Sequence, residues 1–357
     1  MSSTWGEKVK ISIFGESHGK AIGVVLDGLP AGEPLDLDAI ALQMSRRAPG
    51  RDLSSTPRKE SDLPQIVSGV LNGRTTGAPL CGMIENTNTK SGDYDNLKAV
   101  PRPGHSDYTA FLRYGGWNDV RGGGHFSGRL TAPLVFAGAV CRQILQRRGI
   151  LIGAHVACAG NQSDILFDPA NISEKLLTDL SSAYFPVIDP EAEKRMREAI
   201  EAARMAQDSV GGVVECAAIG FPAGIGEPMF GGIEPVLSSV LFGIPACKGV
   251  EFGAGFGAAA LRGSENNDAF YYDGEQVKTK TNRAGGILGG ISTGMPIVFR
   301  AAFKPTPSIS LEQDSVDLTA KVDTKLCVHG RHDPCIVPRA VPAVEAAAAI
   351  ALINMMI

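Results

Sequence analysis

Residues 102–129 hold the densest group of side chains in this chain that could do chemistry. The segment contains Arg102-Pro-Gly-His105-Ser-Asp107 and then Arg121-Gly-Gly-Gly-His125-Phe126-Ser127-Gly-Arg129. Arginine offers a planar fork of donors suited to phosphate and carboxylate, and histidine moves protons near neutral pH. Glycine lets backbone N–H groups approach an anion closely, because it has no Cβ. The segment predicts a loop where an anionic substrate gains or loses a proton, although a glycine-rich turn pair with solvated arginines fits the same composition.

Two further segments carry side chains of the same kinds. Residues 325–339 include Cys327, His329, Arg331, His332 and Asp333, followed by Cys335 and Arg339, but the spacing lacks the second ligand pair of a structural zinc site. We therefore expect no metal, and interpret the His-Asp pair between arginines as suited to acid–base work on an anion. Residues 304–308, Lys-Pro-Thr-Pro-Ser, offer a lysine, hydroxyls and free N–H groups, which suit either a phosphate or a rigid solvated turn.

Two more candidate positions lie near the start of the chain. Ser17 and His18 lie in the loop Gly15-Glu-Ser-His-Gly19, where flanking glycines allow the imidazole to be aimed, although a lone loop histidine is usually just solvated. Arg46 and Arg47 end a predicted helix, where they either favour the negative end of its dipole or bind an anion.

Composition limits the function classes. The chain has 357 residues, 44% hydrophobic and 20% charged, with a net charge of −4, so nothing indicates nucleic-acid binding or an acidic membrane surface. Seven scattered cysteines argue against a disulfide framework and for a reducing compartment, which we take to be the cytoplasm. The chain opens with no signal-peptide pattern, and the apolar segment 346–353 is shorter than the roughly 20 residues of a membrane span. We expect that segment to be a buried core helix.

Apolar periodicity predicts strands at residues 8–14, 21–26, 64–72, 78–86, 150–159, 211–220, 249–257 and 296–303. It predicts helices at 35–47, 130–147, 189–207 and 233–242, and an alanine-rich terminal helix opened by Pro338 or Pro342. The helix at 130–147 starts where the glycine loop ends, so its free N–H groups would face a bound anion. Residues 87–101 and 263–282 are predicted loops, and residues 282–294 a bulged strand pair that could also admit a flat ring or a phosphate. We expect one compact α/β domain over residues 1–357.

Eight blocks, taken in order, resemble chorismate synthase. They are residues 14–19 (FGESHG), 46–50 (RRAPG), 84–87 (IENT), 102–107 (RPGHSD), 121–124 (RGGG), 284–290 (AGGILGG), 304–308 (KPTPS) and 331–334 (RHDP) with 338–342 (PRAVP). No single block is specific, whereas the ordered set is very specific. The resemblance implies an α/β (α+β) fold with helices sandwiched between sheets, and a homotetramer.

The resemblance also implies a lyase of the shikimate pathway. Its substrate would be the small molecule 5-enolpyruvylshikimate 3-phosphate, converted to chorismate by anti-1,4-elimination of phosphate, and reduced FMN would be required without net redox change. By resemblance His105 assists the departure of phosphate, His18 protonates or holds the reduced flavin, and Asp333 with Ser17 and Ser127 helps the flavin take the ring proton. The implied FMN contacts are His125, Phe126, Ser127, Gly289, Lys304, Pro305, Thr306, Pro307, Ser308 and Arg331. The arginines for the phosphate and carboxylates would be Arg47, Arg121, Arg129, Arg331 and Arg339.

Two positions depart from the family pattern. Many relatives carry Arg-Ser-Ser where this chain has His125-Phe126-Ser127, and many carry an arginine at Leu53, where a nicotinamide nucleotide contact is inferred. We therefore expect an enzyme that uses externally reduced FMN, with NADPH only as an indirect reductant. The rival hypotheses are an FMN-dependent oxidoreductase acting on an anionic small molecule, a non-catalytic anion-binding protein, and a metal hydrolase built on residues 327–335.

Overall fold

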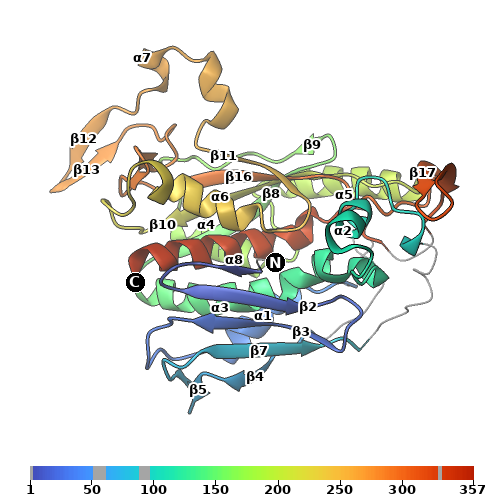
Figure 1. Ribbon diagram of the computed structural model, residues 1–357. Helices are drawn as coiled ribbons and strands as arrows, with labels where there is room; N and C mark the ends of the chain where they lie inside the picture. The colour runs from blue at the N-terminus through green and yellow to red at the C-terminus, as the bar shows by residue number, and fades with distance from the viewer. Residues whose placement is uncertain (1–2, 51–61, 88–96, 329–331) are drawn as a thin grey trace.

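Two five-stranded antiparallel sheets enclose a layer of helices (Figure 1). The computed structural model describes residues 3–50, 62–87, 97–328 and 332–357. The first sheet has the order β1 (Thr4–Trp5), β2 (Lys10–Gly15), β3 (Ala21–Asp27), β7 (Leu80–Glu85) and β4 (Gln65–Ser68). The second has the order β11 (Cys247–Phe252), β16 (Ile297–Phe303), β10 (Gly212–Ile219), β8 (Leu151–Ala159) and β9 (Gln162–Ser163). This arrangement confirms the predicted sandwich.

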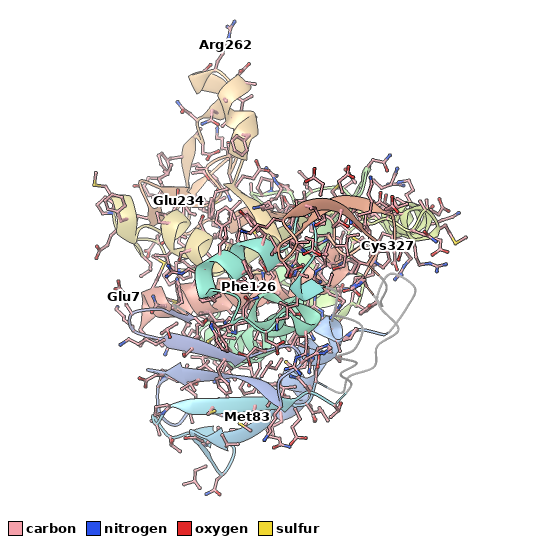
Figure 2. All side chains as sticks on the ribbon, turned by 45° about the vertical axis from the view of Figure 1, so that its right-hand side comes forward. Glu7, Met83, Phe126, Glu234, Arg262 and Cys327 are labelled. Carbon is pink, nitrogen blue, oxygen red and sulfur yellow. The ribbon has the colours of Figure 1, made fainter. Side chains whose placement is uncertain are left out.

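The remaining strands form four short hairpins outside the two sheets. These are β5 (Val70–Leu71) with β6 (Arg74–Thr75), β12 (Phe270–Asp273) with β13 (Gln276–Thr279), β14 (Ile287–Leu288) with β15 (Ile291–Ser292), and β17 (Gln313–Asp317) with β18 (Val322–Leu326). The β12–β13 hairpin and the short helix α7 (Gly263–Asn266) project from the body of the molecule in both views (Figures 1 and 2).

Helices α1 (Leu37–Arg47), α3 (Thr131–Arg147) and α8 (Val337–Met356) form the central layer. Asp36 caps α1, since its carboxylate accepts the N–H groups of Asp38 and Ala39. Helix α8 carries apolar residues on all sides, and this pattern agrees with its burial on all sides. It lies close to α3 at Gly138, where a methyl group would come within 2.2 Å of the Ala346 Cβ, so glycine is what permits this approach of the two helices.

The other helices surround this layer: α2 (Asp107–Tyr114), α4 (Glu174–Ser182), α5 (Pro190–Met205) and α6 (Ile233–Leu241). One buried ion group ties four elements together. Glu345 of α8 accepts bonds from Arg46 (2.5 Å), Arg142 (3.1 Å) and the Ala154 N–H of β8 (3.0 Å). Breaking such a buried group by removing one partner costs about 3–5 kcal/mol, so it fixes how α1, α3 and β8 meet α8.

The structure confirms most predicted elements and corrects several. The segment predicted as a loop around Arg102 contains helix α2, and residues 263–282 contain α7 and the β12–β13 hairpin. The hairpin β17–β18 was not predicted, and strand β11 ends at Phe252, earlier than expected. Pro338 lies in the first turn of α8, whereas Pro342 lies inside that helix. Most of the predicted loop at 87–101 falls outside the described residues.

Helix α8 has the length and apolar composition of a membrane span, and among the described residues no other helix has. However, 78% of its apolar window is buried inside the protein, which is typical of a core helix. All seven cysteines are free thiols.

Candidate active site

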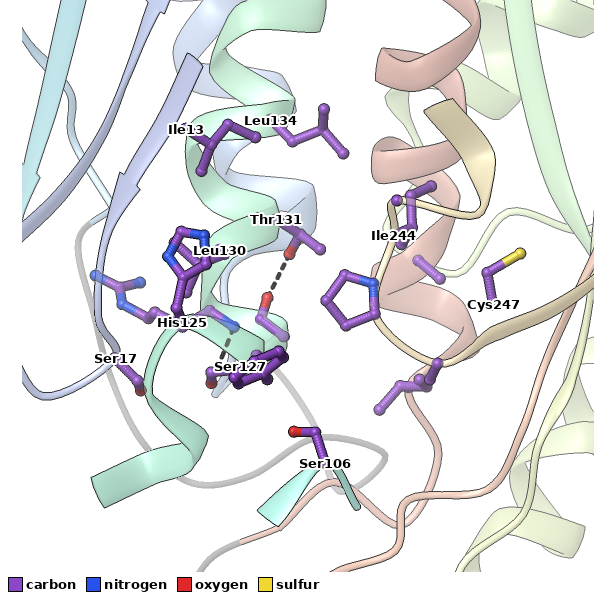
Figure 3. A pocket seen from close by; sticks show the side chains of 18 of the residues that line it. Ile13, Ser17, Ser106, His125, Ser127, Leu130, Thr131, Leu134, Ile244 and Cys247 are labelled. Carbon is purple, nitrogen blue, oxygen red and sulfur yellow. Dashed lines mark hydrogen bonds between the residues drawn. The ribbon is translucent and has the colours of Figure 1, made fainter. Parts of the chain in front are cut away.

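A cavity of about 820 Å³ opens where β1 and β2, the start of α3 and the loop after α6 meet the start of α8 (Figure 3). Its volume lies in the range of small-molecule sites, roughly 300–1,000 Å³. One part of the wall is apolar, with Ile13 and Leu134 on one side and Ile244 on the other (Figure 3). The opposite part carries arginines, histidines and hydroxyls. A ligand with a flat apolar portion and several negative charges would suit both parts.

His105 is held by a buried carboxylate at the start of α2. Its Nδ1 lies 2.6 Å from Asp107 Oδ1, and Asp107 also accepts bonds from Nε (2.7 Å) and Nη2 (2.8 Å) of Arg102. Because a carboxylate only accepts, Nδ1 carries the proton and Nε2 is left as the proton-accepting atom. Burial lowers the pKa of His105, and although Asp107 opposes this, Arg102 adds to the lowering. The imidazole is therefore neutral near pH 7 before an anion binds.

Asp107 remains ionised throughout the physiological range. Burial alone would raise the pKa of its carboxyl, but the hydrogen bonds from Arg102 and His105 hold that pKa well below its usual value. Arg102 Nη1 also donates to Ser308 Oγ at 3.0 Å, so the group joins the 304–308 turn.

Three arginines from distant parts of the chain gather on the polar wall. Arg47 and Arg129 share the buried carboxylate of Asp62, with Arg47 Nη1 2.6 Å from Asp62 Oδ2. Arg339 pairs with Asp333 and donates from Nε to the Arg47 carbonyl at 2.9 Å. Burial lowers the pKa of Arg47 to about 10; Asp62 opposes this and the charges of Arg339 and Arg129 reinforce it. Three cations against two carboxylates leave a local excess of positive charge, which favours an anionic ligand.

The Gly122–Gly124 loop lies close to both His18 and His105. A methyl group at Gly122 would lie 2.7 Å from His18 Nε2 and 2.8 Å from Ser17 Oγ, and one at Gly123 would lie 3.2 Å from His105 Nε2. All three glycines have positive φ, a conformation that L side chains rarely adopt. Glycine is needed here for two reasons: the backbone has positive φ, and the loop lies too close to the His18 and His105 rings to carry a side chain.

Two buried polar atoms of the cavity wall have no hydrogen-bond partner among the described residues. They are Thr306 Oγ1 and His332 Nε2. Burial lowers the pKa of His332 to about 4, and the charge of Arg102 adds to the lowering, so the ring is neutral. Because buried polar groups are nearly always hydrogen-bonded, these two atoms indicate where a ligand supplies partners. Lys304, which donates to the Gly104 carbonyl, lies on the same wall.

Most predicted site residues line this single cavity, and a few do not. Those on its wall are Ser17, Arg47, His105, His125, Phe126, Ser127, Arg129, Lys304, Thr306, Pro307, Ser308, Asp333 and Arg339. His18 is buried directly behind Gly122. Three others are not among the lining residues: Pro305, Gly289 in the β14–β15 turn, and Arg121, whose half-exposed side chain pairs with Asp119 at 2.8 Å. Arg331 and Leu53 lie outside the described residues.

Three residues of the site were given no role from the sequence, whereas His332 was named as half of a His-Asp pair. Arg102 and Asp107 belong to a block that was quoted for the resemblance, so position within that block was the available signal. Asp62 had none, because its role depends on two arginines from elsewhere in the chain. Among the described residues no group of three or more His, Cys, Asp or Glu side chains is placed to hold a metal ion.

Comparisons with known proteins agree with this geometry. The family model described as chorismate synthase matches residues 9–357. A chorismate synthase of Dehalococcoides mccartyi is 47% identical over 355 residues, covering 99% of this chain and 96% of that protein. One from Thermococcus kodakarensis is 47% identical over 347 residues, covering 97% and 95%. A chorismate synthase crystal structure at 28% identity superposes with a TM-score of 0.77 over 99% of this chain and 92% of the other. The chain therefore belongs to the chorismate synthase family.

Proposed function

We propose that this cavity converts 5-enolpyruvylshikimate 3-phosphate to chorismate, with reduced FMN bound beside the substrate. The C–O bond to phosphate breaks, phosphate leaves with the bonding electrons, and a ring proton is lost, so the reaction is a lyase reaction with no net redox change. The observation that carries the proposal is the convergence of a buried arginine cluster, a carboxylate-held histidine and unpartnered polar atoms on one cavity.

The donor set of the cavity fits FMN. Its apolar wall suits a flavin ring, while Lys304 and the unpartnered Thr306 Oγ1 suit its phosphate. Reduced flavin, when bound, supplies an electron-rich ring beside the substrate and an atom that can take up a proton. His18, behind Gly122, would hold the flavin, and Ser17 and Ser127 lie on the wall that Asp333 also lines.

The chain's own residues perform binding and proton transfer in this proposal. Arg47, Arg129 and Arg339 bind the carboxylates and phosphate, and their preorganised charge stabilises the negative charge that builds on the leaving group. The bound anion raises the pKa of His105, because a nearby negative charge favours the imidazolium. Protonated at Nε2, His105 then donates to the departing phosphate. Asp333, held by Arg339, would help the bound flavin to take up the ring proton.

The deciding experiment is anaerobic incubation with 5-enolpyruvylshikimate 3-phosphate and photoreduced FMN. We expect phosphate and chorismate to appear in equal amounts while the flavin remains reduced. Stoichiometric flavin oxidation with a reduced product would instead favour an FMN-dependent oxidoreductase. With NADPH and oxidised FMN alone we expect little turnover, because we propose that reductant to act only indirectly. Full turnover under that condition would contradict this part of the proposal.

The same proposal includes a cytoplasmic homotetramer. Free cysteines throughout the chain are compatible with a reducing compartment. The projecting arm, residues 254–282, exposes large aromatic side chains, including Phe256 and Tyr272 at 85% and 77% exposure. Exposed aromatic clusters of this kind favour burial between copies of a chain. Light scattering of the purified protein measures the assembly directly.

A further inference from the structure

The N-terminal segment Ser3, Thr4 and Trp5 forms part of the cavity wall. Among the described residues this segment, the N-terminal wall, pairs with one strand, β2, in the register Thr4↔Ser12 and Trp5↔Ile11. Because β1 is two residues long and lies at the edge of its sheet, the ladder alone holds it weakly. Its position must therefore depend on side-chain anchors.

Three such anchors are present. The Trp5 indole N–H donates to Ser239 Oγ at 2.7 Å, so the wall is attached to α6 on the far side of the cavity. Asn354 Oδ1 accepts the N–H groups of Glu7, Lys8 and Val9 at 3.1, 2.9 and 3.0 Å, which fixes the turn that follows. At the other end Ser3 Oγ lies 2.7 Å from His125 Nε2.

His125 links the N-terminal wall to the loop of residues 15–19, which contains Ser17 and His18. Its Nδ1 lies 2.7 Å from the Gly15 carbonyl, so Nδ1 carries the proton and Nε2 accepts the Ser3 hydroxyl. Gly15 is two residues before Ser17, which lines the cavity. Both ring nitrogens of His125 are therefore engaged by the protein, and its role is to position two wall segments relative to each other.

We infer that the N-terminal wall belongs to the flavin site, with Trp5 contacting the bound flavin ring and His125 as the residue that positions the wall. Trp5 lines the cavity together with Ile11, Ile13, Val240 and Ile244, and with Phe126 and Phe242 it is one of the aromatic side chains on the cavity wall. Flat aromatic ligands gain most from contact with aromatic rings. The inference rests on the proposed function, since it takes FMN as the ring ligand.

Oxidised FMN is a suitable probe, because its binding is measured without turnover. We expect Trp5→Ala to raise the Kd for FMN at least ~10-fold, the scale of a lost ring contact, and Trp5→Phe to raise it less. His125→Ala and Ser3→Ala should each weaken binding and combine without adding, because they break one link. His125→Gln should restore much of the affinity, since an amide can donate to Gly15 and accept from Ser3. Trp117→Phe, which changes the chain's other tryptophan on an exposed surface, is the matched control.

Hydrogen exchange provides a second readout that does not rely on a measured Kd. The Ile13 N–H donates to the Ser3 carbonyl at 2.9 Å, so its exchange reports attachment of the wall to β2. We expect FMN to slow this exchange in the wild type and to slow it less in His125→Ala. If FMN binds the wild type, but Trp5→Ala binds equally well and Ile13 exchange does not respond, the inference is overturned and the proposed function is untouched. If FMN does not bind the wild type at all, the proposed function fails and the inference fails with it.

Discussion

Replacing Asp107 by asparagine should damage both stability and turnover. The carboxylate is 4% exposed and accepts four bonds, from the Arg102 backbone N–H (3.1 Å), from Nε and Nη2 of Arg102, and from His105. Asparagine has one acceptor atom and no charge, so it leaves the Arg102 guanidinium, itself 3% exposed, buried without a counter-ion. Removing one partner of a buried pair costs about 3–5 kcal/mol. That is a large fraction of a typical stability of about 5–15 kcal/mol.

The catalytic loss has a separate cause. Without the carboxylate, His105 is no longer fixed with its proton on Nδ1, and Nε2 is no longer held for transfer to the leaving group. Loss of a positioned acid or base lowers turnover by about 10²- to 10⁴-fold. Thermal unfolding monitored by circular dichroism measures the first effect, and phosphate release at a temperature where the variant is folded measures the second.

Asp119→Asn is the matched control, because Asp119 pairs with Arg121 in the same segment but at the surface, where such pairs contribute about 0–1 kcal/mol. The stability difference should also depend on pH. The folded pKa of Asp107 is depressed, so its contribution is present above the unfolded pKa of about 4 and is lost as pH falls below it. Equal melting temperatures for Asp107→Asn and Asp119→Asn at pH 7, or wild-type turnover in Asp107→Asn, would refute this reasoning.

Three further outcomes are expected. His155 lies between two buried carboxylates whose hydrogen bonds raise its pKa despite burial. The stability that the protonated ring adds below pH ~6.5 should therefore disappear as pH rises through the folded pKa. The melting temperature of His155→Gln should vary less over that range than the melting temperature of the wild type. His332→Phe should weaken substrate binding roughly 10-fold in calorimetry, because it removes a hydrogen bond between Nε2 and the ligand. Unchanged affinity would show that Nε2 makes no such bond. The double variant Phe256→Ser, Tyr272→Ser should shift light scattering toward smaller species, and an unaltered mass would exclude the arm from assembly.

The sequence predicted elements well wherever local patterns determine them. Helix α1, predicted at residues 35–47, is capped by Asp36, and the helix at Thr131–Arg147 begins where the glycine loop ends. Helix α2 was missed because Gly115, Gly116 and the surrounding polar residues favoured a loop, whereas the helix is only eight residues long. The β12–β13 hairpin was missed because β12 is exposed along its whole length and β13 over its first half, so no alternation of apolar and polar residues marks them.

The same distinction between local patterns and tertiary contacts applies to the site residues. Residues within motifs, such as His105, Asp333 and Arg339, were found, and the fold places all three on one cavity wall. Residues whose role depends on tertiary pairing were not found from the sequence. Nothing near Asp62 in the sequence indicates that it lies between Arg47 and Arg129. The position of His125 could be predicted, but its two bonds to Gly15 and Ser3 depend on how separate strands meet.

The placement of α8 has a consequence for how the protein is made. Helix α8 lies in the middle of the molecule, between sheets whose strands all precede it in the chain and are therefore translated earlier. Until Val337–Met356 leaves the ribosome, the surfaces of α3, β8 and β10 that contact α8 are uncovered, and Arg46 and Arg142 have no Glu345. We therefore expect nascent chains to expose this apolar surface until α8 has emerged, and to gain from chaperones that bind during translation.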